Sequence, residues 1–327
     1  MRGFARSIIG WQRQHGRHDL PWQIERSPYR VWLSEVMLQQ TGVKSVRPYF
    51  ERFTARFPTL QALAQADEQA VLALWAGLGY YARARNLHRA ARQILSEHGG
   101  ELPANQKALE ALPGIGPSTA GAILALAYDQ PGVVLDGNIK RVLARIEGVG
   151  VPLKGEALRQ LWQSAKQRTP ARECRVYVQG MMDLGATLCT RHHPACDRCP
   201  VSGHCRAQKE NRAHELPLSI KRAPLTIKEQ WLWLGLVSDR IYLMPRASEG
   251  LWGGLWTPPL SSEPAQEAYE TLPAFIHTFS HFRLRLHPQC VATEALPAGG
   301  EWFTLASLPP LPAPIGRLLA SLAPARS

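Results

Sequence analysis

Two carboxylate side chains stand out in this chain because of where the sequence places them. Glu35 falls within the helix predicted from Tyr29 to Thr41, with Val31 and Leu38 on the same face and no Lys or Arg four residues away. A carboxyl on an apolar face loses hydration in its charged form, which raises its pKa and suits it to donate a proton near neutral pH. The alternative, a Glu at the water-facing edge of the helix, is favoured by this helix taken alone.

The second carboxylate, Asp136, opens the run Asp-Gly-Asn-Ile-Lys-Arg that ends at Arg141. A helix is predicted to follow it, because apolar residues recur there on one face at Ile139, Val142, Leu143 and Ile146. Asp is a common N-cap residue, so helix capping is the simplest interpretation of Asp136 by itself.

A hairpin rich in glycine and proline precedes this run. Leu112-Pro-Gly-Ile-Gly-Pro117 separates helices predicted over residues 104–111 and 117–127, and Pro117 suits the first turn of the second helix. Such a hairpin presents unpaired N–H groups at a helix N-terminus, where a phosphate can bind. The Gly-Ile-Gly tripeptide alone is more simply an ordinary turn.

A third run, Gly77-Leu-Gly-Tyr-Tyr-Ala-Arg-Ala-Arg-Asn86, combines flexible backbone with two aromatic and two arginine side chains. Aromatic side chains beside Arg can fill the space left by a base flipped out of a duplex and can grip the nucleic-acid backbone. The start of a packed helix explains the same residues equally well.

Four of the six cysteines fall close together, in the order Cys189-(6)-Cys196-(2)-Cys199-(5)-Cys205. In a chain expected in a reducing cytosol, this clustering favours a metal site over disulfides. Four thiolates suit a structural zinc or an iron–sulfur cluster, and the spacing alone leaves both open. Cys174 and Cys290 are more simply buried thiols.

The elements that must position these residues fit a globular protein of two or three domains. The chain has 327 residues, of which 45% are hydrophobic and 20% charged. It has no apolar run long enough to span a bilayer and no clear secretory signal. Residues 1–208 carry 27 Lys and Arg against 16 Asp and Glu, whereas residues 209–327 carry 11 against 10. The basic N-terminal part favours a polyanionic partner.

Hydrophobic patterns predict helices in the N-terminal part, including residues 1–18, 44–75 and 149–179, and a helix capped by Ser27 that begins at Pro28. Residues 207–226 lack a clean period and contain two prolines, which indicates an interdomain linker. Beyond them we expect a strand hairpin (231–237 and 241–244), a rigid aromatic loop (250–256), a half-buried strand (282–287) and a helix within 310–322.

Taken together, the hairpin and the aspartate that follows it resemble the helix-hairpin-helix DNA glycosylase superfamily. Leu33-Ser-Glu-Val-Met-Leu-Gln-Gln-Thr41 resembles the catalytic-acid helix of its adenine-specific MutY branch, and the cysteine spacing matches the [4Fe-4S] loop of the endonuclease III and MutY branches. The resemblance covers essentially the whole chain. It implies a mostly helical glycosylase domain (1–206, cluster loop 189–205), a linker (207–226) and a NUDIX-like α/β domain that recognises 8-oxoguanine (227–327).

The resemblance also implies a function in base excision repair. The enzyme would flip adenine out of an 8-oxoguanine:adenine or guanine:adenine mispair in double-stranded DNA and hydrolyse its N-glycosidic bond. Glu35 would protonate the base, Asp136 would stabilise the oxocarbenium-like sugar, and Asn138 would orient water or the sugar. One [4Fe-4S] cluster would be bound by Cys189, Cys196, Cys199 and Cys205. We expect a cytoplasmic monomer, associated with the nucleoid if the source is bacterial, without a membrane partner.

Further positions are implied in the same way. Trp22, Gln23, Val43 and Gln179 match adenine-pocket positions, although some relatives carry charged residues in place of Gln23 and Gln179. DNA-binding positions are matched by Gln40, Tyr80, Leu112, Gly114, Ile115 and Gly116, of which the first two match residues that wedge into DNA. Phe279-Ser280-His281 matches the loop that recognises 8-oxoguanine, although the residues alone suggest a strand end and turn. A working NUDIX hydrolase needs a Glu-rich metal-binding box. Because Glu263, Glu267 and Glu270 are scattered here, pyrophosphate hydrolysis is not expected.

Ser118 distinguishes two related activities. Endonuclease III-like enzymes have a Lys there that forms a Schiff base for strand cleavage, and a hydroxyl cannot form that imine. We therefore expect a monofunctional glycosylase, while Lys140 leaves weak lyase chemistry open. Ser118 taken alone is a hydrogen-bonding residue of a first helical turn. Two other functions were weighed: a lyase acting on oxidised pyrimidines, disfavoured by Ser118 and the C-terminal domain, and a noncatalytic lesion-binding protein, disfavoured by the two carboxylates.

Overall fold

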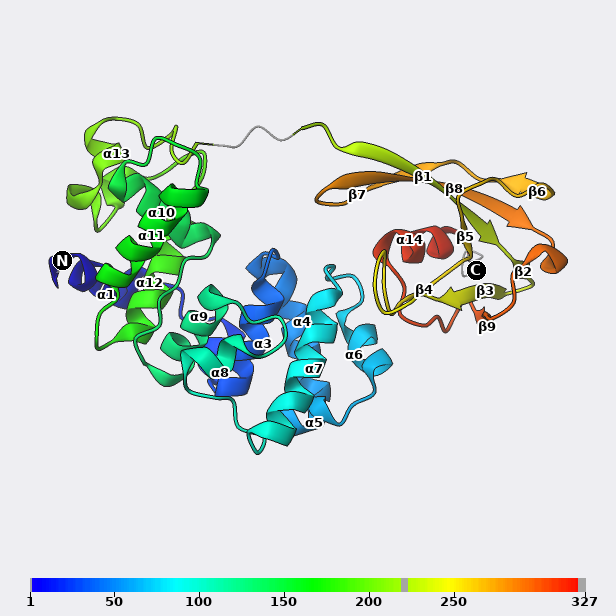
Figure 1. The fold of residues 1–327 in the computed structure, drawn as a ribbon, viewed down its shortest axis with the longest axis horizontal. Helices are drawn as coiled ribbons and strands as arrows, with labels where there is room; N and C mark the ends of the chain where they lie inside the picture. Colours follow the sequence, from blue (N-terminus) through cyan, green and yellow to red (C-terminus); the bar gives the residue numbers. More distant parts are fainter. Residues whose placement is uncertain (1, 219–222, 323–327) are drawn as a thin grey trace. The chain divides into compact units, whose positions relative to one another are not determined.

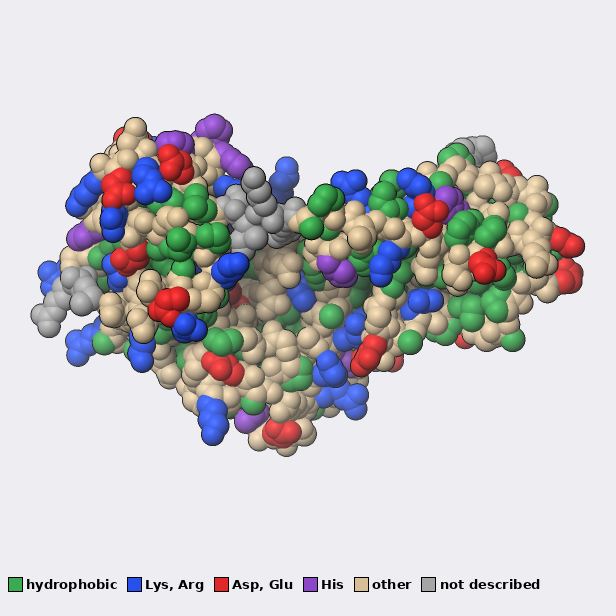
Figure 2. Space-filling view, turned by 45° about the horizontal axis from the view of Figure 1, so that its top comes forward, with side chains coloured by type: hydrophobic (Ala, Val, Ile, Leu, Met, Phe, Trp, Pro, Cys, Tyr) green, Lys and Arg blue, Asp and Glu red, His purple; other side chains and the backbone are tan. Residues whose placement is uncertain are grey.

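The computed structural model describes residues 2–218 and 223–322, and the chain divides into two compact units (Figure 1). The helical unit comprises residues 1–65 and 86–221, and the mixed unit comprises residues 66–85 and 222–327. No helix among the described residues is long and apolar enough to cross a membrane. On the face shown in Figure 2, Lys and Arg side chains are spread over the surface and do not form a single patch.

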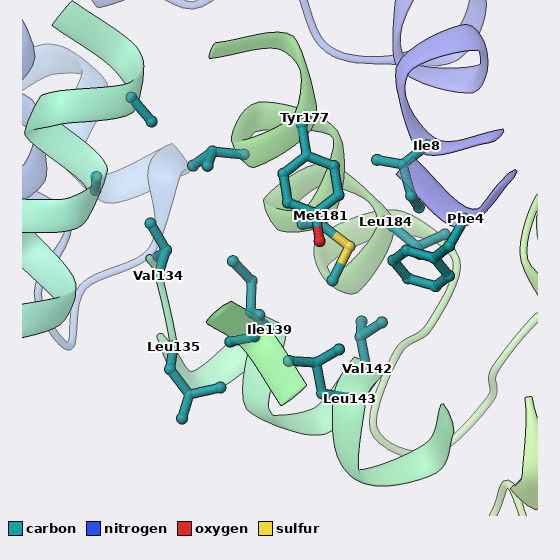
Figure 3. Packing of buried hydrophobic residues seen from close by; sticks show 14 of the residues in the cluster. Phe4, Ile8, Val134, Leu135, Ile139, Val142, Leu143, Tyr177, Met181 and Leu184 are labelled. Atoms are coloured by element: carbon teal, nitrogen blue, oxygen red, sulfur yellow. The ribbon is translucent and has the colours of Figure 1, made fainter. Parts of the chain in front are cut away.

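The core of the helical unit is built around α12 (Cys174–Thr187), which packs against α1 (Arg2–His15), α9 (Pro117–Tyr128) and α10 (Gly137–Glu147). Figure 3 shows Tyr177 and Met181 of α12 among the buried side chains of α1 and α10. Two glycines let these helices come close. A Cβ on Gly180 would lie 2.8 Å from Ile8 Cγ2, and one on Gly185 would lie 2.7 Å from Asn138 Cβ. The close approach at Gly185 sets Asn138 directly against α12.

The helix that carries Glu35 is α3 (Pro28–Leu38), which follows the short α2 (Pro21–Ile24). Its start was predicted correctly, because the Ser27 hydroxyl accepts a hydrogen bond from the backbone N–H of Arg30 at 3.2 Å. Its end was predicted three residues too late. The chain leaves the helix after Leu38, and Gln40 adopts a left-handed conformation with φ of 59°. The next helices are α4 (Val43–Arg56) and α5 (Leu60–Ala64).

The glycine- and proline-rich hairpin joins α8 (Gln106–Glu110) to α9, so both predicted helices are present and the first is shorter than expected. Gly114 has φ of +79°, and a Cβ there would lie 2.9 Å from Asn86 Cβ, so a side chain is disfavoured on both counts. The side chains of Leu112 and Ile115 are buried, at 2% and 5% exposed. The apolar side chains of the hairpin therefore hold it in place against the helical unit.

The predicted helical pair after Val149 is formed by α11 (Gly155–Arg168) and α12. The cysteine run follows as a loop with two short 3-10 turns, η1 (Cys196–Arg198) and η2 (Ser202–His204), and then α13 (Arg206–Lys209). Cys205, Ala207, Ala213 and Leu216 form a small buried cluster. The first part of the predicted linker thus packs against the cysteine loop, while its residues 219–222 lie outside the described residues.

The mixed unit contains two β-sheets in its described residues. In the larger sheet β1 (Thr226–Leu234) pairs in parallel with β8 (Phe282–Val291), flanked by β5 (Leu260–Ser261), β6 (Ala268–Thr271) and β7 (Phe275–Thr278). The smaller contains β2 (Leu236–Val237), β3 (Arg240–Pro245), β4 (Trp256–Thr257) and β9 (Glu301–Thr304). The hairpin predicted from residues 231–244 was therefore partly wrong. Of the predicted first strand, only Leu236 and Val237 pair with β3, because the longer run before them belongs to the other sheet.

The alternation predicted in β8 is confirmed, since Leu284 and Leu286 are 1% and 0% exposed while Arg283 faces solvent. The C-terminal helix is α14 (Ala313–Leu322), which buries Ile315 and Leu319. The same unit includes α6 (Glu68–Trp75) and the turn that leads into α7 (Ala82–Glu97).

Candidate active site

One pocket of about 380 Å³ in the helical unit brings together residues from several helices. Glu35 comes from α3, Val43 from the start of α4 and Ser118 from the first turn of α9. Asp136 and Asn138 enter from the start of α10, and Met182 and Ala186 from α12. The structure therefore places all four residues predicted as catalytic in one pocket, although they are more than 100 positions apart in sequence at the extremes.

The Glu35 side chain is only partly exposed, at the wall of this pocket. Burial is the main cause that raises the pKa of Glu35 to about 8, and the negative charge of Asp136 adds to it. At neutral pH the protonated carboxyl thus predominates. Glu35 is therefore a potential proton donor, as the apolar face of its helix suggested.

Asp136 is the N-cap of α10, and its Oδ1 accepts a hydrogen bond from the backbone N–H of Ile139 at 2.7 Å. Burial raises its pKa, while hydrogen bonds from backbone N–H groups and the charges of Arg141 and Lys140 act in the opposite direction. These donors and cations stabilise the ionised form. Asp136 can therefore cap α10 and also act in the pocket, because the helix N-terminus that it caps orients its carboxylate and the same side chain lines the pocket.

Ser118 is the second residue of α9 and contacts the segment before Asp136. Its hydroxyl accepts a hydrogen bond from the backbone N–H of Leu135 at 3.1 Å. Leu135 is buried at 2% exposed, so this bond satisfies an N–H group that is removed from water. Ser118 therefore fixes the backbone from which the Asp136 side chain projects.

Sequence reasoning missed Arg141, which orients Asn138. Its guanidinium donates to Asn138 Oδ1 at 2.9 Å, to the Gly185 carbonyl at 2.6 Å and to the Cys189 carbonyl at 2.8 Å. Because the amide oxygen faces Arg141, the NH₂ group of Asn138 is the end left for the pocket. The three-residue separation of Asn138 and Arg141 on one helix is the only sequence signal for this contact.

The predicted adenine-pocket residues are divided among three environments. Val43 lines the pocket with Glu35, whereas Gln23 and Gln179 line a neighbouring pocket of about 330 Å³. Trp22 is buried at 5% exposed and packs edge-to-face against Phe50, with ring centroids 5.3 Å apart.

Sequence reasoning missed an ion pair that connects the linings of these two pockets through the buried Asp183. Arg17 lines the larger pocket, and its Nε donates to Oδ1 of the buried Asp183 at 2.8 Å. The same oxygen accepts from Gln179 Nε2 at 2.9 Å. Asp183 therefore holds the NH₂ group of Gln179 and leaves the Gln179 carbonyl oxygen for other partners.

Gln40 and Tyr80, predicted to wedge into DNA, share an unusual backbone. Both are exposed and adopt left-handed conformations, with φ of 59° and 50°. Such conformations are uncommon outside glycine and are concentrated at functional sites. The Arg83 guanidinium lies 5.4 Å from the centroid of the Tyr80 ring.

In the mixed unit, the loop from Phe279 to His281 has one packed aromatic side chain, Phe279, and two exposed polar side chains. The Phe279 ring stacks on Phe282 with centroids 4.6 Å apart, and the His277 ring meets it edge-on at the same distance. Ser280 and His281 are exposed, and the Ser280 hydroxyl lies 3.2 Å from His281 Nδ1. The loop is thus anchored by Phe279 and presents polar atoms to solvent.

The four clustered cysteines are free thiols that line one cavity, together with Arg145. Arg145 is 1% exposed, and its guanidinium donates to Cys189 Sγ at 3.1 Å, to the Thr190 carbonyl at 2.7 Å and to the Arg191 carbonyl at 2.9 Å. A buried guanidinium thus contacts the sulfur of Cys189 and the backbone that follows it.

Comparison with known proteins places this geometry in a family. Residues 33–167 match the model of the HhH-GPD superfamily of base excision DNA repair proteins, and residues 232–321 match that of the NUDIX domain. The adenine DNA glycosylase of Buchnera aphidicola subsp. Acyrthosiphon pisum (strain APS) is 36% identical over 313 residues, which cover 92% of this chain and 89% of that protein. The chain belongs to the adenine DNA glycosylase family.

Other comparisons agree with this assignment. The Homo sapiens adenine DNA glycosylase is 33% identical, with 92% of this chain and 70% of that protein covered. Among solved structures, a thermostable thymine-DNA glycosylase matches 64% of this chain and 96% of its own with a TM-score of 0.56 and 26% identity. A non-covalent endonuclease III–DNA complex has the same fold at 20% identity and a TM-score of 0.54. The chain is therefore a DNA N-glycosylase with a helical HhH-GPD domain and a C-terminal NUDIX-like domain.

The cysteine loop of this family member contains the donor atoms that an iron–sulfur cluster requires. Among the described residues, no group of three or more His, Cys, Asp or Glu side chains is arranged to hold a single metal ion. A [4Fe-4S] cluster requires a different arrangement from a single ion, because each of its four irons binds one cysteine thiolate. Four free cysteines around one cavity are that donor set, so the residues present fit the group.

Proposed function

We propose that this adenine DNA glycosylase removes adenine mispaired with 8-oxoguanine or guanine in duplex DNA, with Glu35 as general acid and Asp136 as the stabilising carboxylate. The observation that carries the proposal is the contrast between these two groups in one pocket. Burial raises the pKa of both carboxyl groups, to about 8 for Glu35, but at Asp136 hydrogen bonds from the start of α10 and the charges of Arg141 and Lys140 act against this rise. Two carboxyl groups whose environments differ in this way suit acid-assisted cleavage of a glycosidic bond.

The reaction follows from these positions. Adenine leaves as an anion unless a ring nitrogen is protonated, and the Glu35 carboxyl supplies that proton. The sugar then acquires oxocarbenium character, which the nearby Asp136 carboxylate stabilises electrostatically. Asn138, held by Arg141 with its NH₂ group toward the pocket, orients the sugar or the attacking water.

The proposed enzyme is monofunctional because Ser118 occupies the place of a Schiff-base lysine. A hydroxyl forms no imine with the sugar aldehyde, so strand cleavage has no nucleophile at this position. The hydrogen bond from Leu135 gives Ser118 a positioning role. Lys140, two residues after Asn138, is the amine that a residual lyase activity would use.

Recognition of the partner base is assigned to Phe279, Ser280 and His281, with Tyr80 and Gln40 entering the base stack. The exposed polar groups of Ser280 and His281 suit hydrogen bonding to a base edge. The hairpin backbone at Gly114 and Gly116 and the first turn of α9 supply N–H groups for a phosphate of the DNA. This interface needs no apolar contact from Leu112 or Ile115, whose side chains are buried.

One [4Fe-4S] cluster is proposed at Cys189, Cys196, Cys199 and Cys205. When bound, it would crosslink the loop to the end of α12 and hold Arg145 in place. The Arg141 contact to the Cys189 carbonyl connects this loop to Asn138.

The proposal is tested by single-turnover release of adenine from duplexes that pair adenine with 8-oxoguanine, guanine, cytosine or thymine. The wild type should release adenine fastest opposite 8-oxoguanine, and strand scission should require alkali. The Glu35→Gln variant should bind the same duplexes without turnover. Spontaneous nicking at an oxidised pyrimidine would instead support a lyase, and tight binding without release by the wild type would support a lesion-binding protein.

A further inference from the structure

A rigid loop of the mixed unit, Gly250 to Trp256, has no role in the function proposed so far, and we call it the bracket loop. Trp252 within it is 7% exposed with φ of 55°, and Leu255 is fully buried. The backbone N–H of Gly254 donates to the Ala247 carbonyl at 3.1 Å, and that of Leu255 donates to the Trp252 carbonyl at 3.1 Å. A Cβ on Gly253 would lie 2.4 Å from the Ser248 carbonyl oxygen. These internal bonds and the tight packing fix the shape of the loop.

One side of the bracket loop supports the loop proposed to recognise 8-oxoguanine. The Trp252 ring lies 6.0 Å from the Phe279 ring and 6.3 Å from the His277 ring, between centroids. Phe279 is also stacked on Phe282, so it is enclosed by aromatic rings. Trp252 thus limits the positions available to Phe279, from which Ser280 and His281 project.

The other side of the bracket loop holds the segment next to Tyr80. The Gly253 carbonyl accepts a hydrogen bond from the Arg85 guanidinium, and the Gly254 carbonyl accepts one from Gln69 Nε2 at 3.2 Å. A Cβ on Gly254 would lie 3.2 Å from Leu72 Cδ1, so the backbone itself packs on α6. Arg85 lies in the first turn of α7, five residues after Tyr80.

The turn that carries Tyr80 is itself held by side-chain hydrogen bonds. Trp75 Nε1 and the Arg83 guanidinium both donate to the Gly79 carbonyl, each at 3.1 Å. The Arg83 guanidinium lies over the rings of Trp75 and Tyr80. The Tyr81 hydroxyl accepts from the Gly77 N–H at 3.1 Å and donates to the Leu311 carbonyl at 3.4 Å. Tyr80 is therefore held on both sides of its left-handed residue.

We propose that the bracket loop couples recognition of the lesion to the Tyr80 wedge, with Arg85 and Gln69 as positioning residues. The inference rests on the proposed function, in which Phe279–His281 contacts the 8-oxoguanine that pairs with the target adenine. When that loop seats on the oxidised base, Trp252 transmits its position through the Gly253 and Gly254 carbonyls to the turn at Tyr80. The wedge enters the stack in register with 8-oxoguanine and less well with guanine. Such a mechanism requires an energetic coupling between two sites that do not touch the same atoms.

The test is a double-mutant cycle between Tyr80→Leu and His281→Ala, measured in two backgrounds. The background with an intact bracket is the wild type, and the cut background is Arg85→Met with Gln69→Leu, which removes both donors to the loop. The measured quantity is the single-turnover rate of adenine release opposite 8-oxoguanine and opposite guanine. Arg92→Met is the matched control, because Arg92 is an exposed arginine on the same helix.

In the intact background the two substitutions should be non-additive by at least about fivefold opposite 8-oxoguanine, the lower range of allosteric coupling. In the cut background they should be additive within about twofold, as for independent sites. The preference for 8-oxoguanine over guanine should shrink in the cut background and persist in Arg92→Met. Destabilisation alone would lower both rates equally, so the ratio separates positioning from folding.

Additivity in the intact chain, or full coupling in the cut background, would overturn the proposal. If the double variant does not fold, Gln69→Leu alone should reduce the coupling partially, and an unchanged coupling there would count against the bracket. A wild type that releases no adenine would refute the proposed function, and the same cycle is then measured on binding affinities for the same duplexes. The two failures are therefore distinguishable.

Discussion

The carboxylate of Asp136 raises the pKa of Glu35, with which it shares a pocket, and burial of Glu35 makes the larger contribution to the final value of about 8. In the proposed mechanism the two groups have different tasks, because Glu35 must keep its proton and Asp136 must lose its own. Their pKa values therefore define the pH range in which both are in the required form.

This pair predicts a bell-shaped pH dependence of base release. The single-turnover rate should fall as pH rises through about 8, because Glu35 loses the proton that it donates. It should also fall at acidic pH, at a value above the ordinary 3.8 of Asp, since burial raises the pKa of Asp136. A rate that continues to increase from pH 7 to pH 9 would contradict the role of Glu35 as general acid.

The same carboxyl predicts that the folded chain loses stability as pH rises from about 4.5 to about 8. The folded chain holds the Glu35 proton up to about pH 8, whereas the unfolded chain releases it near 4.5. The resulting stability is fully present below 4.5 and is lost as pH rises toward 8. Glu35→Gln removes this loss, so at pH 8 it should increase the free energy of unfolding by a few kcal/mol, on the order of 1.4 kcal/mol per pKa unit.

The measurement is chemical denaturation of the wild type and of Glu35→Gln at pH 5 and pH 8. The stability difference between the two proteins should be larger at pH 8. The matched control is Glu51→Gln, a change at an exposed position of α4, which should leave the pH dependence as in the wild type. Equal stability of Glu35→Gln and wild type at both pH values would show that the carboxyl is well solvated.

The parts of the fold that depend on neighbouring residues were predictable from the sequence. Ser27 and Pro28 predicted the start of α3, and the alternation of Leu284 and Leu286 with polar residues predicted the buried face of β8. Local hydrogen bonding and periodic burial leave direct traces in sequence. The same holds for Asp136, whose capping bond joins residues three positions apart.

The rest depends on contacts between distant segments, which no local pattern encodes. The run from Trp231 to Val237 looked like one strand, but it is divided between two sheets because its first part pairs with β8, about 55 residues later. Gln23 and Gln179 line a different pocket from Val43, and the contact of Arg17 with Asp183, which also holds Gln179, joins segments 166 positions apart. Gln179 and Asp183 are four positions apart, a separation so common on helices that it did not predict their hydrogen bond.

Substitutions at Ser118 test whether its hydroxyl acts by holding the backbone next to Asp136. Ser118→Ala leaves the buried Leu135 N–H without its acceptor, which should cost about 1–3 kcal/mol of folding free energy. The rate of adenine release should also fall, because the backbone before Asp136 is no longer fixed. Ser118→Thr keeps the hydroxyl and should restore both properties. Loss of activity in Ser118→Thr together with a normal thermal melt would instead indicate steric exclusion of the nucleotide.

The cysteine loop leads to the last prediction. Cys199→Ala should abolish binding of iron and sulfide and should lower the thermal stability of the purified protein, because the loop loses the group that four thiolates are expected to hold. The readouts are iron and sulfide content, visible absorbance and the thermal melt. Cys290→Ala is the matched control, since Cys290 is a buried thiol in the mixed unit and lies outside the cavity lined by the four cysteines. It should keep its full iron content. Zinc in place of iron and sulfide in the wild type would overturn the assignment, and an unchanged metal content in Cys199→Ala would show that Cys199 is not a ligand.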